Sequence, residues 1–205
     1  MNINDVERTD KEEVKDYLQA IFEKQHALAI KYQPIEARSG LLQTTDFPVD
    51  INSPAGQARL KDLAWRTVEE LGEATECMEE NEEHFREELI DALHFATELV
   101  LSTGLTYGNF ISLEEMMERE KVSEDLIGHL WRFTENLGIA MNCLKNKPWK
   151  QTHMETDIPY FTSRIMKMYV SLIDVLHVAG MSAEDVYTYY FKKNQVNQFR
   201  QRSMY

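Results

Sequence analysis

Acidic side chains are concentrated between residues 69 and 91, where eleven carboxylates are accompanied by one arginine. At the helical period, Glu70 and Glu73 lie together beside the apolar stripe of one expected helix, and Glu88 and Asp91 share a face of the next. The second helix is apolar on nearly all sides, so we expect Asp91 to be buried. Crowded carboxylates in a nonpolar setting repel one another, and too few basic residues follow in sequence to neutralise them.

Divalent cations would make this crowding tolerable. Two antiparallel helices that carry Glu-x-x-Glu and Glu-x-x-Asp, joined by a short turn, bring four carboxylates to one point. Oxygen ligands without a histidine-rich set favour Mg²⁺, with Mn²⁺ as the alternative. The sequence therefore predicts a metal site at Glu70, Glu73, Glu88 and Asp91. The other acidic residues at the tip of this hairpin are expected to be solvated.

The elements that position these residues are all expected to be helices, since no segment alternates β-branched residues with period two. The predicted fold class is all-α, a helical bundle with an antiparallel metal-binding pair. One domain is expected over 1–205. The segment 33–56 is predicted as a loop that covers something, and 104–155 as an insertion-like helical region. Helices are predicted at 10–31, 57–80, 83–103, 112–146, 155–179 and 182–201.

Capping signals support these boundaries. Ser112 with Glu115 and Thr152 with Glu155 fit capping boxes, as does Thr9 with Glu12. Ser53 before Pro54 reads as an N-cap with proline in the first turn, Gly180 as a helix stop, and Ser182 as the next start. The pattern Leu-Ile-Asp-x-Leu-His occurs twice, at 89–94 and 172–177. It is weak evidence for a duplicated segment, because buried helices use few residue types.

Composition narrows the class of protein. The net charge of −13 argues against binding to nucleic acid or to anionic membrane. Two unpaired cysteines fit a reducing compartment, and the chain shows no leader pattern and no long apolar run. We expect a soluble, cytoplasmic protein that reaches polyphosphates through a divalent cation.

The motifs resemble those of a known family. Glu-Leu-Gly-Glu at 70–73 and Glu-Leu-Ile-Asp at 88–91 are similar to the E-x-x-E…E-x-x-D signature of the all-α nucleoside triphosphate pyrophosphatases, which include MazG-like proteins, dimeric dUTPases and phage dCTPase–dUTPases. The stretch 193–205 resembles the closing K-N-x-x-N-x-x-R-Q-x-x-G-Y motif of the dimeric dUTPase branch. The resemblance covers 57–103 and 165–205 well.

This resemblance implies Mg²⁺-dependent hydrolysis of a deoxynucleoside triphosphate to its monophosphate and pyrophosphate, with dUTP as the favoured substrate and dCTP or a broader set as the alternative. The four carboxylates would hold the metal, with Glu70 and Glu73 as catalytic residues and Glu70 orienting or deprotonating the attacking water. The tail positions implied to contact phosphate and sugar are Lys193, Asn197, Arg200 and Tyr205. A homodimer is predicted because long helices such as 83–103 are apolar on more faces than one domain of this size covers. The resemblance also suggests a phage-like source.

Two departures from the family pattern concern the tail and the base. Met204 stands where the family has glycine. On the first helix, where the family reads uracil with Gln and Asn, the chain offers Gln25 and His26, but Ala29 occupies the Asn position. The preferred base therefore stays open at this stage.

The sequence leaves three further interpretations. An acidic helical adaptor would fit the charge but would need neither the carboxylate motifs nor the tail. A di-iron bundle would want two Glu-x-x-His helices, and only Glu23 with His26 begins such a motif with glutamate. His94 and His177 are expected to be hydrogen-bonded core residues rather than ligands.

Overall fold

The computed structural model describes residues 16–119, 125–147 and 149–203, and within these ranges it contains helices and no strands. Thr9, Met204 and Tyr205 lie outside the described residues. The all-α fold class is confirmed. The helices are α1 Tyr17–Ser39, α2 Pro54–Cys77, α3 Glu82–Ser102, the short 3₁₀ helix η2 Tyr107–Asn109, α4 Leu113–Glu118, α5 Leu126–Cys143, α6 Ile158–Val178 and α7 Ala183–Arg202.

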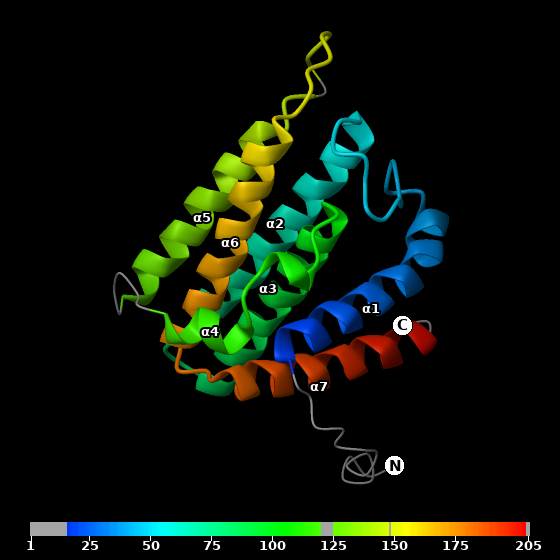
Figure 1. Cartoon of the computed structure of the whole chain (residues 1–205). Helices are drawn as coiled ribbons and strands as arrows, with labels where there is room; N and C mark the ends of the chain where they lie inside the picture. Colours follow the sequence, from blue (N-terminus) through cyan, green and yellow to red (C-terminus); the bar gives the residue numbers. More distant parts are fainter. Residues whose placement is uncertain (1–15, 120–124, 148, 204–205) are drawn as a thin grey trace.

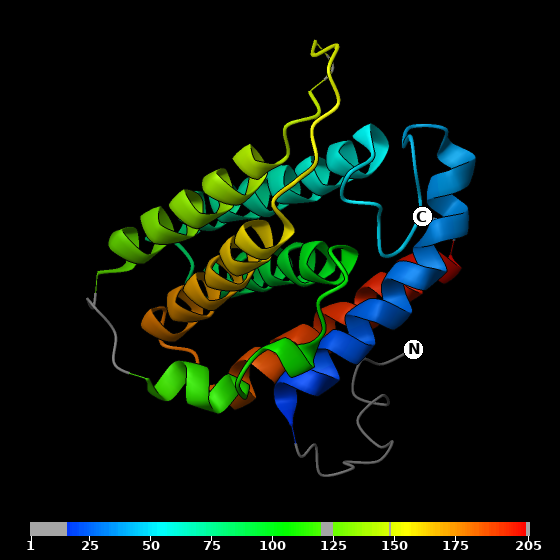
Figure 2. The ribbon, with the colours of Figure 1, turned by 45° about the horizontal axis from the view of Figure 1, so that its top comes forward.

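Two helical hairpins form the centre of the molecule. Helices α2 and α3 pack along each other, as do α5 and α6, and α3 also contacts α6. Helices α1 and α7 lie together on the other side of α3, so that the α2–α3 pair has α5 and α6 on one side and α1 and α7 on the other (Figures 1 and 2). The core between these layers is apolar, with side chains such as Leu60, Leu93 and Leu172 fully buried. This packing buries the apolar faces and leaves the polar flank of α2–α3 facing α1 and α7.

Local capping determines where the central helices begin. Ser53 accepts a hydrogen bond from the Gly56 amide, with Pro54 in the first turn of α2. Asn81 does the same for α3 and thereby ends the short turn between the metal-motif helices. Ser182 caps α7 directly after Gly180, whose φ of 82° favours glycine. The predicted starts at 53–54 and 182 and the stop at Gly180 are confirmed.

Three predicted boundaries were wrong. The expected loop 33–56 begins later, because α1 continues through Pro34 and ends at Gly40, a left-handed C-cap. The expected helix 112–146 is two helices: α4 begins at the predicted Ser112 capping box but ends at Glu118, and Asp125 caps α5 anew. A second N-cap, Asp125, lies inside the segment that was predicted as one helix, so the segment forms two helices.

The helix predicted from residue 155 begins at Ile158 instead. Its N-cap is Asp157, which accepts from the Tyr160 amide, and no helix starts at the expected Thr152–Glu155 capping box. The preceding segment is held elsewhere, since the amide of Thr156 donates to Asn52 Oδ1 at 2.8 Å. A hydrogen bond to a residue far away in the sequence therefore holds this segment, and no helix begins at the predicted capping box.

Within the part of the chain that the structure describes, no single helix combines the length and apolar composition of a membrane span, and only the sharply bent pair α6 and α7 meets those criteria together.

Candidate functional site

Three of the four predicted carboxylates converge between α2 and α3. Glu70 and Glu73 lie one turn apart on α2, and Glu88 faces them from α3, with one oxygen from each carboxylate within 4.8 Å of the others. Glu88 is buried, Glu70 is half-buried and Glu73 is exposed. The cluster therefore opens to solvent on one side, as a site that exchanges ligands requires.

The electrostatics of this cluster favour a cation. Burial and, after it, the nearby charges of Asp91, Glu73 and Glu88 together raise the pKa of Glu70 to about 7. Without another counter-charge, such a carboxyl group is about half protonated near pH 7. A doubly charged cation among these oxygens would relieve the same repulsion, and oxygen-only ligands suit the hard divalent ions. The residues present therefore fit a divalent metal.

Asp91, the fourth carboxylate, is paired with a cation from another helix. Lys193 Nζ of α7 forms an ion pair with Asp91 Oδ2. Burial raises the pKa of Asp91, and the Lys193 ammonium opposes that rise. In this structure Asp91 thus connects the carboxylate cluster to the basic tail.

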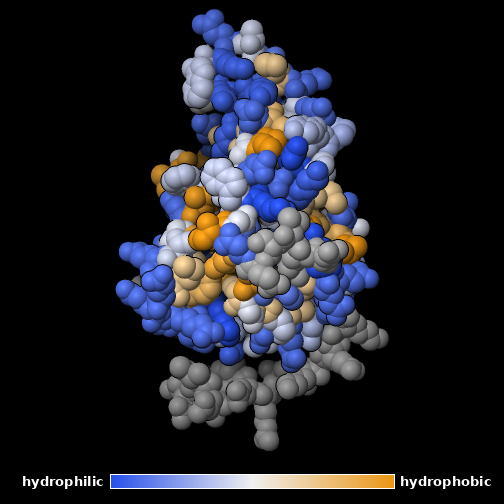
Figure 3. Space-filling model, turned by 90° about the vertical axis from the view of Figure 1, so that its left-hand side faces the viewer, coloured by the Kyte–Doolittle hydropathy of each residue, from blue (hydrophilic) through white to orange (hydrophobic). Residues whose placement is uncertain are grey.

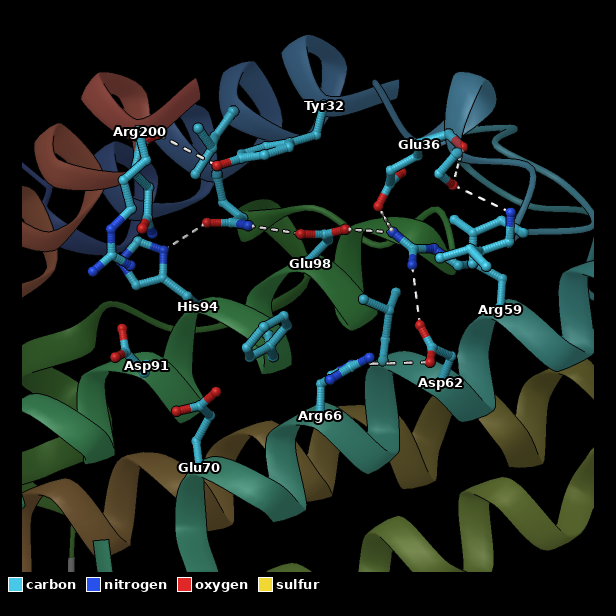
Figure 4. A pocket seen from close by; sticks show the side chains of 18 of the residues that line it. Tyr32, Glu36, Arg59, Asp62, Arg66, Glu70, Asp91, His94, Glu98 and Arg200 are labelled. Carbon is cyan, nitrogen blue, oxygen red and sulfur yellow. Dashed lines mark hydrogen bonds and ion pairs between the residues drawn. The ribbon is translucent and has the colours of Figure 1, made fainter. Parts of the chain in front are cut away.

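A cavity of about 560 Å³ extends from the cluster between α1, α2, α3 and α7. Figure 4 shows Glu70 and Asp91 at one end of it and Arg200 of α7 nearby, while Arg59 and Glu36 lie at the other end. Lys193, Asn197 and Arg200 line the cavity together. Cationic and amide donors therefore stand opposite the carboxylates, an arrangement suited to a metal-bridged polyphosphate.

A hydrogen-bonded chain of buried polar groups forms the wall between these ends. Arg59 binds Glu98 at 3.0 Å, and Glu98 Oε2 accepts from the Gln25 side-chain amide at 3.0 Å. Gln25 Oε1 in turn accepts from the Tyr190 hydroxyl at 2.6 Å and lies 2.9 Å from His94 Nδ1. An ionised Glu98 can only accept hydrogen bonds, and Arg59 stabilises that form, so the chain fixes which way the Gln25 amide points.

His94 is held as a neutral ring by the same surroundings. It is buried and stacks on Tyr190 with ring centroids 3.8 Å apart, and burial lowers its pKa to about 3. A neutral ring facing Gln25 Oε1 carries its proton on Nδ1, which leaves Nε2 as an acceptor, and Nε2 has no hydrogen-bond partner among the described residues. The expected hydrogen-bonded core role of His94 is confirmed, whereas His177 is exposed.

The structure places the remaining predicted residues as follows. Gln25 is buried in the cavity wall, but His26 is exposed and packs against Phe47 outside the cavity lining. Tyr205 lies outside the described residues. Ala29, at the expected Asn position, is buried.

Sequence reasoning missed Glu98 and Arg59. Glu98 follows Asp91 by two helical turns and so continues its face toward the cavity. Arg59 precedes Glu70 on α2 by three turns, also on one face. Both residues could have been predicted by following the helix face of Glu70 along α2 and that of Asp91 along α3. The same helical period predicted the metal motif.

Comparison with known proteins supports a single family. A family model described as dUTPase matches residues 75–205, which include Glu88, Asp91 and the α7 tail but begin after Glu70 and Glu73. No curated protein and no solved structure matches the chain.

Proposed function

Because the chain belongs to the dUTPase family and hydrolyses dUTP to dUMP and pyrophosphate, we propose that Glu70, Glu73, Glu88 and Asp91 are its metal ligands. Membership of this family makes the chain an enzyme rather than an adaptor without catalysis. The ion proposed is Mg²⁺, with Mn²⁺ able to replace it. The observation that carries the assignment is the convergence of three carboxylates within 4.8 Å at the mouth of a cavity lined by cations.

The carboxylates would divide the chemistry between them. A bound divalent ion would neutralise the phosphate oxygens and acidify the attacking water. Glu70 and Glu73 are the proposed catalytic residues, and Glu70, which lies in the carboxylate cluster and lines the cavity, is the proposed acceptor of the proton that the water loses. The water oxygen bonds to phosphorus, the anhydride bond between the α- and β-phosphates breaks, and pyrophosphate leaves.

The tail residues would bind the substrate from the opposite wall. Lys193 pairs with Asp91 and lines the cavity, so its ammonium lies where the phosphates meet the metal ligands. Arg200 can hold phosphate oxygens with two parallel N–H groups, and Asn197 offers an amide to the sugar or phosphate. Tyr205 is proposed to complete this contact.

Recognition of uracil is proposed to lie at the polar wall. Gln25 uses its carbonyl oxygen for Tyr190 and His94, and one amide N–H for Glu98, so that its second N–H remains as a donor. His94 Nε2 is the neighbouring acceptor. Uracil presents its N3–H donor between two carbonyl acceptors, whereas cytosine presents these functions in the opposite order, with an acceptor at N3 beside a donor amino group, so the fixed order of Gln25 and His94 would favour uracil. His26, exposed outside the cavity, has no part in this arrangement.

The metal proposal is tested by counting bound Mn²⁺ and measuring pyrophosphate release from dUTP. We expect Glu73→Gln to weaken Mn²⁺ binding and to remove most turnover, while Glu76→Gln, at an exposed glutamate of the same helix outside the converging cluster, leaves both unchanged. If Glu73→Gln binds Mn²⁺ and turns over dUTP like the unmodified protein, the ligand assignment is wrong.

The base proposal is tested with dUTP and dCTP side by side. Gln25→Glu replaces the remaining amide donor with an acceptor and places a second carboxylate against Glu98. We expect the ratio of kcat/KM for dUTP over dCTP to fall by roughly tenfold or more, as the loss of a buried hydrogen bond predicts. An unchanged ratio would contradict base reading by Gln25.

A homodimer is also proposed. Large apolar side chains are exposed on the outer faces of the central hairpins: Trp65 of α2 is 61% exposed, and Ile127 and Trp131 of α5 are 59% and 70% exposed. The side of the molecule that carries α5 shows orange side chains among blue ones (Figure 3). A second copy would cover them, and light scattering at micromolar concentration should give twice the mass of the 24.0 kDa chain. A monomeric mass would contradict this.

A further inference from the structure

The α5–α6 hairpin repeats two sequence patterns of the α2–α3 hairpin, which carries the proposed metal ligands. The pattern Trp-Arg-x-x-Glu-x-Leu-Gly-x-Ala occurs in α2 at 65–74 and again in α5 at 131–140. Leu-Ile-Asp-x-Leu-His occurs in α3 at 89–94 and again in α6 at 172–177. Each helix of one hairpin thus has its counterpart, in the same order, in the other.

The side-chain contacts show the same register. Counting along the two patterns, Asn136 corresponds to Glu70 and Ser171 to Glu88. Glu70 lies within hydrogen-bond reach of Glu88, and Asn136 Nδ2 donates to Ser171 Oγ at 3.4 Å. Equivalent positions therefore meet across both hairpins, which two chance sequence matches would not produce.

The copy has lost the carboxylates that make a metal site. Asn136, Ile139 and Ser171 stand where the first hairpin has its three converging glutamates. Only Asp174, the counterpart of Asp91, keeps its charge, and Arg119 Nη2 neutralises it at 2.5 Å. Two of these three positions are still polar, but none of them carries the negative charge that a divalent cation needs.

The former site is still an open groove, of about 810 Å³, and its lining is now basic. Arg132 and Lys167 line it from α5 and α6, and neither forms an ion pair with a carboxylate among the described residues. The hydroxyl-bearing Thr162 and Ser163 also line it. With Arg119, three cations line the groove against two carboxylates, Glu135 and Asp174, in a chain whose net charge is −13.

Nothing equivalent to α1 and α7 covers this groove on the described chain, because both helices pack on the side of the molecule that holds the first hairpin (Figure 1). Arg132 and Lys167 are exposed cations that line the same groove, so a phosphate bound there could pair with both of them. Their separation from the carboxylates of the catalytic cavity also frees them to bind phosphate directly.

We propose that the α5–α6 groove is a second, metal-independent site for a phosphate-bearing anion, held by Arg132 and Lys167. The catalytic hairpin binds phosphate through carboxylates and a cation, and its copy would bind it with the cationic side chains themselves. Pyrophosphate and the 5′-phosphate of a nucleoside monophosphate share this chemistry, and both are released by the reaction. The site would therefore respond to product. The proposal does not depend on the metal assignment.

The test is equilibrium binding of pyrophosphate, and separately of dUMP, to the full chain in excess EDTA. Without divalent ions the catalytic carboxylates repel both anions, so binding there is suppressed. We expect one site per chain, and Arg132→Gln with Lys167→Gln should weaken it roughly tenfold or more, as the loss of charge-assisted hydrogen bonds predicts. The matched control is Arg38→Gln with Lys192→Gln, two exposed cations outside both cavities.

The two ligands separate the sources of phosphate. Binding of pyrophosphate alone identifies a diphosphate site, and binding of both identifies a site for phosphate monoesters. Turnover of dUTP with Mg²⁺ reports that each variant is folded, and Lys167→Glu gives an independent single change that must also weaken binding. The proposal is overturned if the unmodified protein binds neither anion in EDTA, or if the groove variants bind as the control does.

Discussion

Replacing Glu70 with glutamine should stabilise the metal-free protein at alkaline pH while removing its turnover. The pKa of Glu70 is about 7 in the folded chain, against an ordinary value of 4.5, because burial and three neighbouring carboxylates disfavour its charge. That difference is worth at most roughly 3 kcal/mol. Since the side chain is only half-buried, solvent screening reduces the expected gain to about 1–2 kcal/mol.

The sign of the effect depends on pH. The carboxyl group has a raised pKa in the folded state, so its charge destabilises the fold increasingly as the pH rises from about 4.5 and fully above about 7. Thermal unfolding in EDTA at pH 8 should therefore show a melting temperature roughly 3–6 °C higher for Glu70→Gln than for the unmodified protein. At pH 5 the difference should shrink, because the native carboxyl group is then largely protonated.

Glu76→Gln serves as the control, because Glu76 is an exposed glutamate of the same helix, outside the cluster. It should melt with the unmodified protein at both pH values. Adding Mg²⁺ at pH 8 should raise the melting temperature of the unmodified protein but raise that of Glu70→Gln much less, since ligand binding stabilises only a protein that binds the ion. A Glu70→Gln protein that melts lower than the unmodified one in EDTA at pH 8 would refute the electrostatic account.

Further predictions concern the tail, the backbone and the assembly. Lys193→Met should lower kcat/KM for dUTP roughly 100-fold, because it removes a charge-assisted phosphate contact. Lys192→Met, at the exposed neighbouring lysine, should change kcat/KM by no more than about twofold. Equal effects of the two changes in steady-state kinetics would contradict the tail assignment. Gly56→Ala should lower the melting temperature measured by calorimetry, because the new Cβ would collide with a backbone carbonyl. Gly72→Ala has open space for its Cβ and should raise the free energy of unfolding by up to about 1 kcal/mol. The opposite order of stabilities would disprove the packing described. Trp131→Glu should convert the proposed dimer to a monomer in light scattering, and an unchanged mass would exclude this face as the interface.

The sequence predicted the features that depend on a short stretch of chain. The all-α class and the approximate places of α2, α3 and α7 followed from periodicity and caps at Ser53 and Ser182. The convergence of Glu70 and Glu73 with Glu88 followed from two helices joined by a short turn, because such a connection forces antiparallel neighbours. These features are local, and the helical period alone brings their side chains to one face.

Contacts between distant segments decided the rest. Lys193 meets Asp91, and Arg59 meets Glu98, only because α7 and α2 pack beside α3. The orientation of the Gln25 amide depends on the same kind of long-range contact. Sequence spacing carries no record of such pairs, since residues tens of positions apart can be joined by many packings of the same helices.

The repeated hairpin lies between these cases. The matching patterns at 65–74 and 131–140, and the second copy of Leu-Ile-Asp-x-Leu-His at 172–177, can be found in the sequence, but each alone is a residue pattern common in buried helices. The structure made them meaningful by pairing α5 with α6 as it pairs α2 with α3. The sequence of a single helix determines which of its own residues share a face. The charge of a site between two helices depends also on which helix packs against it, and only the tertiary structure determines that.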